Sequence, residues 1–187
     1  MAERSSLVRL QREYDLALDW HGYELHPETP PGGVEQAAKF GGKERVAAMH
    51  ARLLEFAKGF GITDMKMRQR SPNTRRALAI AELARDQDKL EPWRQIAMDA
   101  HWTRGLDLES DADLRTLAAE AGLDPAEAIA ASHDPRFLSR IDRRRAEAEN
   151  LGVTGIPTFV IGNRGVVGCQ PYEVLAEFVE SAGARKR

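Results

Sequence analysis

Strand-type patterns occur only near the two ends of this 187-residue sequence, and helical patterns fill the space between them. The larger apolar residues Leu16, Leu18 and Trp20 alternate with Ala17, Asp19 and His21, which predicts a strand that runs on through Tyr23 and Leu25. Residues 157–161 and 166–167 flank the turn sequence Gly-Asn-Arg-Gly, which predicts a hairpin. If these strands share one sheet, a long helical crossover must join them, as in parallel βαβ units. The order of elements fits an α/β fold, although periodicity alone does not fix the fold.

The middle of the chain, residues 34–150, has the periodicity of amphipathic helices broken by glycine and proline. Asp124-Pro125 and Asp134-Pro135 each combine an N-cap residue with a proline at the first helical position. One helical face holds the apolar residues Val46, Met49, Leu53, Ala57 and Phe60. We expect a domain made of residues 1–33 and 151–187, with residues 34–150 as a helical insertion. Within that domain we expect helices over 6–14 and 171–182 and a frayed tail over 184–187.

The composition excludes several classes of protein. The formal net charge is −2, whereas a dedicated nucleic-acid binder is normally basic. A single cysteine excludes an internal disulfide and any zinc site with two thiolates from this chain, and no histidine pair has metal-ligand spacing. The first residues have no apolar segment, and no apolar run has the length of a membrane span. We therefore expect neither metal nor membrane association, and we expect a cytoplasmic protein whose thiol stays reduced.

The most informative motif is Val-Thr-Gly-Ile-Pro-Thr-Phe at residues 153–159. It resembles the loop before the third strand of thioredoxin-fold proteins, in which the proline is cis and contacts an extended substrate. A cis X–Pro bond is uncommon and marks a tight turn. The resemblance implies a cis bond before Pro157. It also implies that a peptide or a thiol/disulfide substrate is held by Thr154, Gly155, Ile156 and Pro157.

Other blocks agree with this motif. The sequence Asp-Trp-His-Gly-Tyr-Glu-Leu-His-Pro-Glu at 19–28 is similar to the second-strand signature of DsbA-like oxidoreductases, in their FrnE-like branch. Asn73-Thr74, residues 117–123 and residues 167–171 also resemble that branch, and the similarity extends over residues 7–182. It implies a thioredoxin-like fold with a large all-helical insertion, and disulfide exchange in which a thiolate attacks to form a mixed disulfide.

Two departures from the family concern its chemistry. The first strand of the family and the CxxC motif after it have no counterpart here, so we assign no catalytic residue. Leu78 also stands where the family often has a histidine. We favour a polypeptide start upstream of Met1 or a truncated chain. The alternatives are that the second strand pairs directly with the third, or that a partner chain fills the gap.

The sequence leaves three functions open. The first is a thiol–disulfide oxidoreductase, and the second is a non-catalytic thioredoxin-like binding protein. The third is a glutathione-dependent isomerase or transferase, akin to the 2-hydroxychromene-2-carboxylate isomerases. For glutathione carboxylates, the candidate ligands are Arg70 and Asn73 in a basic turn, although a solvated turn is the favoured interpretation.

Cys169 is interpreted as a small packed residue rather than a reactive thiol. An exposed sheet edge also favours a homodimer.

Overall fold

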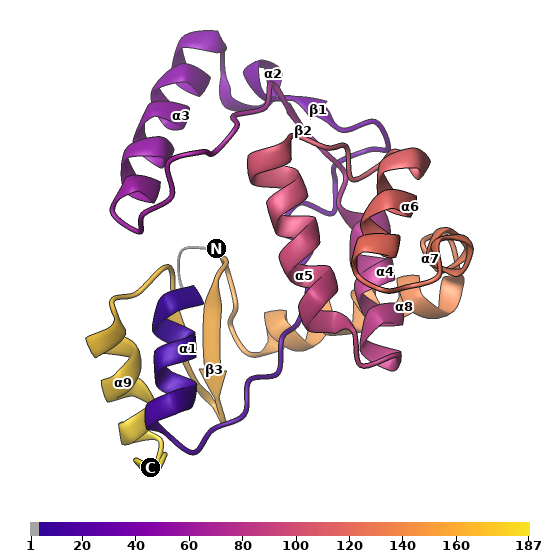
Figure 1. Cartoon of the computed structure of the whole chain (residues 1–187). Helices are drawn as coiled ribbons and strands as arrows, with labels where there is room; N and C mark the ends of the chain where they lie inside the picture. The colour runs from indigo at the N-terminus through magenta and orange to yellow at the C-terminus, as the bar shows by residue number, and fades with distance from the viewer. Residues whose placement is uncertain (1–3) are drawn as a thin grey trace. The chain divides into compact units, whose positions relative to one another are not determined.

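The computed structural model describes Arg4–Arg187 and divides into two compact units (Figure 1). The hairpin unit consists of Met1–His21 and Ala146–Arg187, and the helical unit consists of Gly22–Arg145. The sequence predicts boundaries at 33/34 and 150/151, whereas the compact units separate after His21 and after Arg145. Among the helices of the described chain, none combines the length and apolar character that a membrane span requires.

The described part of the hairpin unit contains a hairpin and two complete helices, besides the end of a helix that begins in the helical unit. Its helices are α1 (Arg4–Glu13) and α9 (Tyr172–Ser181), and its strands are β3 (Thr158–Ile161) and β4 (Arg164–Val167). Helices α1 and α9 contact each other because their apolar residues recur at helical spacing. The buried cluster between them consists of Leu7, Leu10, Tyr14, Leu175 and Val179, and Phe159 of β3 packs against it. One face of the hairpin is therefore covered by the helices.

The predicted hairpin is confirmed, with β3 and β4 paired antiparallel from Thr158↔Val167 to Ile161↔Arg164. The connecting turn needs a residue with positive φ, and Gly162 supplies it at φ 62°. This register puts Phe159 on the covered face of the hairpin. Val160 and Val167 lie on the opposite face.

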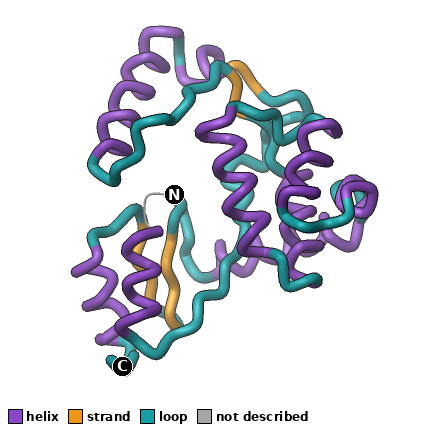
Figure 2. Tube along the Cα trace, viewed as in Figure 1, coloured by secondary structure: helices purple, strands orange, loops and turns teal. Residues whose placement is uncertain are grey.

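The expected strand over Leu16–Leu25 is wrong. The chain from Asp15 to Glu24 is in no helix or strand, and Figure 2 draws the segment after α1 as loop. The side chains still alternate, because Leu16, Leu18 and Trp20 are half-buried against the α1–α9 cluster. A strand also needs a neighbour in a ladder, and β3 pairs with β4 alone within residues 4–187. Direct pairing of this segment with the third strand is therefore also wrong.

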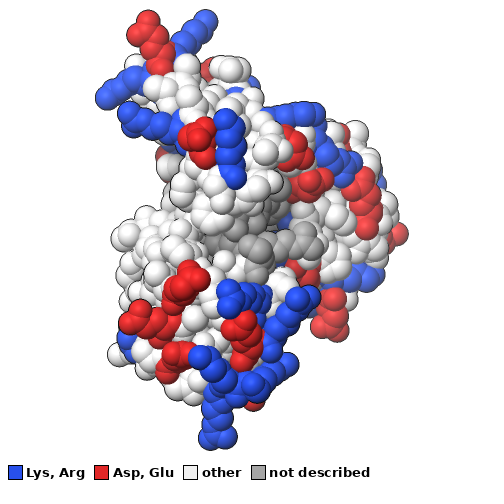
Figure 3. Space-filling view, turned by 60° about the vertical axis from the view of Figure 1, so that its left-hand side comes forward, with Lys and Arg blue, Asp and Glu red and all other residues white. Residues whose placement is uncertain are grey.

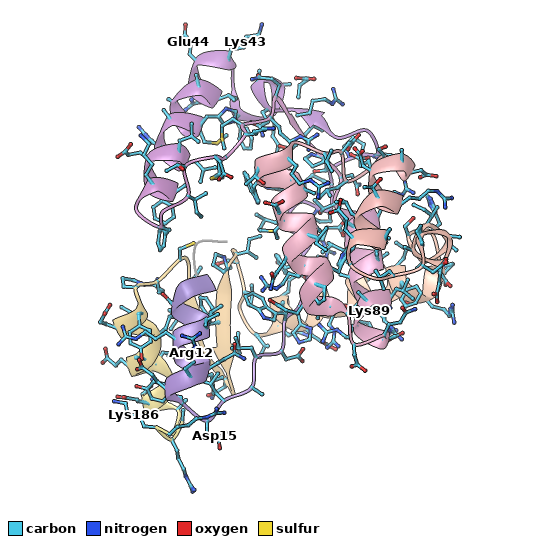
Figure 4. The ribbon with its side chains drawn as sticks, in the orientation of Figure 1. Arg12, Asp15, Lys43, Glu44, Lys89 and Lys186 are labelled. Carbon is cyan, nitrogen blue, oxygen red and sulfur yellow. The ribbon has the colours of Figure 1, made fainter. Side chains whose placement is uncertain are left out.

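The C-terminal tail is not frayed. The Asp15 N–H donates to the Arg185 carbonyl at 2.8 Å, and the Arg187 N–H donates to the Glu13 carbonyl at 2.9 Å. These bonds flank a β-bridge between Tyr14 and Lys186. Figure 4 shows Asp15 and Lys186 at the same end of the hairpin unit. The tail therefore fixes the direction in which the chain leaves α1.

The helical unit contains a two-residue ladder and a series of helices. The ladder pairs β1 (Val34–Glu35) antiparallel with β2 (Arg70–Ser71), which the sequence did not predict. The helices are α2 (Gln36–Phe40), α3 (Lys43–Lys58), α4 (Arg75–Asp86), α5 (Leu90–Asp99), the π-helix η1 (Ala100–Arg104), α6 (Asp111–Glu120), α7 (Pro125–Ala131) and α8 (Pro135–Asn150). Helix α8 extends into the hairpin unit at its C-terminal end.

A continuous apolar core joins α4 to α8 in the helical unit. Ile80, Leu114 and Leu117 are fully buried, and Trp93 donates its indole N–H to the Ala77 carbonyl at 3.1 Å. That hydrogen bond satisfies the polar atom of the largest buried side chain. The predicted N-cap at Asp124 is confirmed, since its carboxylate accepts from the Glu127 N–H at 2.7 Å.

A buried ion pair connects the segment after the hairpin unit to α4. Glu24 is 3% exposed, and its carboxylate accepts a hydrogen bond from the Arg75 guanidinium at 2.8 Å. Arg75 also contacts Asp142 of α8 at 2.8 Å. Arg75 therefore bridges that segment and α8.

We predict that Arg75→Met destabilises the helical unit by about 3 kcal/mol, because it leaves the Glu24 carboxylate buried without its counter-ion. Glu24→Gln should cost less, and the double variant should be more stable than the sum of the two single effects. Urea unfolding followed by tryptophan fluorescence measures all three variants. Strictly additive losses would show that the pair is not coupled.

His101 lies in η1, and its Nδ1 is buried without a hydrogen-bond partner in the described chain. Burial, with a smaller contribution from the charge of Arg68, lowers the pKa of His101 to about 4. The native state therefore keeps this imidazole neutral at pH values where the unfolded chain, with a pKa near 6.5, binds a proton.

We predict that stability is full above pH 6.5 and falls as the pH decreases toward 4, with a loss of about 2 kcal/mol between pH 7.5 and pH 5. Urea midpoints across this pH range measure the loss. In His101→Phe the slope should flatten, since the aromatic ring remains and the titrating nitrogen is gone. An unchanged slope in that variant would assign the pH dependence to other groups.

Candidate functional site

The loop of residues 154–157 connects α8 to β3 in the hairpin unit. Gly152, at φ 76°, ends α8, and the Val153 N–H then closes the last turn on the Ala148 carbonyl at 2.9 Å. The peptide bond between Ile156 and Pro157 is cis. The chain then enters β3 directly, so the loop is placed by a helix end on one side and a strand on the other.

Two hydrogen bonds fix the loop to the hairpin. The Pro157 carbonyl accepts from the Gly168 N–H at 2.8 Å, which continues the ladder by one pair beyond β3 and β4. The Thr158 hydroxyl donates to the Gly155 carbonyl at 2.6 Å. The sequence motif draws attention to residues 154–157, but Thr158 and Gly168 are the residues that hold them. The position of Gly168, directly after the second predicted strand, was the sequence signal that could have indicated this role.

The loop presents both polar and apolar groups at the surface. Thr154 is exposed and Ile156 is 52% exposed, whereas Gly155 and Pro157 are half-buried. Val160 and Val167, on the outer face of the hairpin, are 39% and 49% exposed. An exposed apolar strip next to a fixed loop is a surface that suits a ligand of mixed polarity.

Cys169, the single cysteine, lies in the segment that follows Gly168 and is half-buried. Next to it, Gln170 donates its side-chain amide to the Val167 carbonyl at 2.6 Å. Among the described residues no three His, Cys, Asp or Glu side chains gather as a metal site would require. Cys169 is the single thiol of the sequence, and it directly follows Gly168, whose N–H bonds to Pro157 of the loop.

Asn73 lies in the helical unit, at the start of α4. Its side-chain amide donates to the Thr29 carbonyl at 2.6 Å, and its side-chain oxygen accepts from the Arg75 N–H at 2.9 Å. Its own N–H donates to the Glu109 carboxylate at 2.7 Å. The polar atoms of Asn73 thus connect three segments of the helical unit.

Arg70 also has protein partners. Its guanidinium donates to the Glu35 carboxylate at 2.8 Å and to the Gly33 carbonyl at 3.0 Å. Three further arginines close to Arg70 and Asn73 in the sequence also have protein partners. Their partners are the Leu106 carbonyl for Arg68, Glu24 and Asp142 for Arg75, and Asp111, Ser132 and the Glu109 carbonyl for Arg76. The structure therefore uses this cluster to hold loops and helix starts together.

Charged residues of both signs are mixed on the surface. Figure 3 shows Lys and Arg interspersed with Asp and Glu on the face that it presents. Many of them form ion pairs, such as Arg104 with Glu120 and Arg140 with Asp86. The Arg104 hydrogen bond, against a smaller effect of burial, keeps the pKa of Glu120 below its usual value. This pattern differs from the single-sign surface that attracts nucleic acid.

Comparison with known proteins agrees with this architecture. The model of the DSBA-like thioredoxin domain family matches residues 2–180. A probable DsbA oxidoreductase from Streptomyces coelicolor superposes with a TM-score of 0.73 at 27% identity, over 87% of this chain and 73% of that one. A 2-hydroxychromene-2-carboxylate isomerase shares the fold, with a TM-score of 0.72 at 16% identity, over 97% of this chain and 87% of that one.

The comparison with curated proteins gives no match. The family model nevertheless covers nearly the whole sequence, and both solved structures superpose over most of this chain. The predicted α/β thioredoxin-like fold with an all-helical insertion is thereby confirmed. This chain belongs to the DSBA-like thioredoxin domain family.

Proposed function

We propose that this chain takes part in thiol–disulfide exchange of the DsbA type and that its 154–157 loop binds the substrate. The observation that carries the proposal is the loop itself: Thr154 and Ile156 are exposed on a backbone that Gly168 and Thr158 hold in place. A fixed, exposed loop positions an extended substrate without an ordering cost on the protein side.

The substrate would be a peptide with a cysteine or disulfide, or a small thiol such as glutathione. Ile156 and Val160 offer apolar contact to side chains of such a peptide, and the Thr154 hydroxyl offers a hydrogen bond. The FrnE-like branch is the branch that we propose for this chain, and a reducing compartment such as the cytoplasm is its proposed location. We do not include Arg70 and Asn73 in the site, because protein groups occupy their polar atoms.

In exchange, a thiolate attacks one sulfur of the substrate disulfide, the S–S bond breaks, and a mixed disulfide forms. A second thiolate then attacks the mixed disulfide, which releases the reduced substrate and leaves the enzyme oxidised. Within these 187 residues Cys169 is the single thiol, so both steps cannot be completed by this chain alone. The chain therefore supplies the substrate-binding part, and the attacking dithiol lies outside these 187 residues.

We predict that these 187 residues do not accelerate insulin reduction by dithiothreitol, because Cys169 is half-buried and the sequence holds no second cysteine to form a catalytic dithiol. The turbidity assay should give the same rate for the chain and for Cys169→Ala, which serves as the cysteine-free control. Turnover that depends on Cys169 would contradict this assignment and make the cysteine a nucleophile.

We also predict that Ile156→Glu weakens binding of a disulfide-linked decapeptide dimer by about tenfold, since it replaces apolar contact with a charge. Leu151→Glu is the matched control, because Leu151 is 56% exposed in the same unit and lies outside the loop. Chemical-shift titration measures both affinities, with oxidised glutathione as a parallel probe. Equal losses in the two variants, or no binding of either probe at millimolar concentration, would refute the assigned site.

A further inference from the structure

The chain that follows α9 turns back toward the end of α1. Gly183, at φ 91°, lies just after α9, and the Ala184 N–H bonds to the Val179 carbonyl at 3.0 Å. A left-handed glycine with this backward hydrogen bond is a Schellman motif, which sets the direction of the chain after a helix. The sequence at the end of α9 therefore directs residues 184–187, which we call the tail, toward α1.

The tail pairs with the end of α1 through backbone atoms. The Arg187 N–H donates to the Glu13 carbonyl at 2.9 Å, and the Asp15 N–H donates to the Arg185 carbonyl at 2.8 Å. Carbonyls in the last turn of an α-helix have no partner within the helix. The tail therefore supplies a partner for the end of α1 and, at the same time, binds the first residue of the segment that follows.

A side-chain contact accompanies these backbone bonds. The Lys186 ammonium lies 2.7 Å from a carboxylate oxygen of Glu180, and the Tyr14 hydroxyl donates to the same oxygen at 2.5 Å. Tyr14 is 1% exposed and belongs to the α1–α9 cluster, whereas Lys186 is exposed. Glu180 thus connects the tail to a residue of the buried cluster.

The segment of residues 15–18 begins at this pairing. Leu16 and Leu18 are half-buried against the α1–α9 cluster, and the segment is in no helix or strand. Its backbone bond to another part of the described chain is the bond from Asp15 to the tail. The tail and the apolar packing of two leucines therefore act together to keep this segment on the cluster.

From these contacts we propose that the tail is a latch, which holds residues 15–18 on the α1–α9 cluster. The tail and this segment detach together, while α1, α9 and the hairpin stay folded. A region with few buried apolar contacts and exposed backbone bonds opens at a lower free energy than a core does. Release uncovers the part of the cluster against which Leu16 and Leu18 pack. The latch goes beyond the proposed function, because it uses no thiol and no residue of the 154–157 loop.

The first test removes one backbone bond of the latch in the full chain. Arg187→Pro deletes the N–H that donates to Glu13, and a proline is compatible with the extended residue before it. Amide hydrogen exchange followed by NMR should become at least about tenfold faster at Asp15, which is the effect of losing one net hydrogen bond. The Gly168 amide, which bonds within the hairpin, should keep its original rate.

The same variant shows whether the segment moves with the tail. The soluble nitroxide TEMPOL broadens the NMR lines of methyl groups that it can approach. In Arg187→Pro we expect stronger broadening of the Leu16 and Leu18 methyl lines, because these side chains leave the cluster when the latch opens. The methyl lines of Leu175, which is 1% exposed within the cluster, should stay as narrow as in the original chain.

A second variant, Lys186→Met, removes the ionic contact with Glu180 and keeps the backbone bonds. An exposed ion pair stabilises weakly, so exchange at Asp15 should become about threefold faster. Arg12→Met is the matched control, because it removes the same charge from an exposed position in the last turn of α1 (Figure 4). It should leave the exchange rate of Asp15 unchanged.

Each of the following results would overturn the proposal. The Asp15 amide is unprotected in the original chain, or Arg187→Pro leaves its exchange unchanged. The amide exchanges faster while the Leu16 and Leu18 lines stay narrow, which would mean that the tail frays alone. Exchange at Gly168 accelerates equally, which would mean that the whole unit is destabilised. Arg12→Met has as large an effect as Lys186→Met, which would assign the change to net charge.

Discussion

The requirement that each strand have a hydrogen-bonded neighbour determines how the hairpin unit is built. Two segments pack apolar side chains against the α1–α9 cluster. One is β3, through Phe159, and the other is the segment of residues 16, 18 and 20, which are half-buried. Only β3 has a ladder partner, and it is β4. The same cluster therefore supports one segment that is a strand and one that lies in no helix or strand. The ladder, rather than apolar packing, limits the size of the sheet.

In the helical unit, polar contacts connect the loops to the start of α4. The Glu109 carboxylate accepts from the Asn73 and Gly32 N–H groups, both at 2.7 Å, and so connects the start of α4 to the loop before β1. The Glu24–Arg75 pair connects the same helix to the segment that follows the hairpin unit. A carboxylate that accepts backbone N–H bonds organises a loop as a helix cap does. The arginines around Asn73 therefore bond to carboxylates and carbonyls of this chain.

Much of the fold could be predicted from local sequence, and the failures share a cause. The cap at Asp124 and the turn at Gly162 were predictable because each depends on a few adjacent residues. The strand at 16–25 was not, because its alternation specifies a buried face and leaves the ladder partner undetermined. The partners of Arg70 were also out of reach, since Glu35 is distant in the sequence. The tail bonds at Arg185 and Arg187 have no local signal either.

The residues that the family motif brings to the surface offer backbone and apolar groups rather than reactive side chains. The 154–157 loop is held through the main-chain carbonyls of Gly155 and Pro157. Reactivity requires a thiolate, and Cys169 is the one thiol in the sequence. In the function proposed above, recognition would rest on the 154–157 loop, and bond exchange would need a thiol besides Cys169.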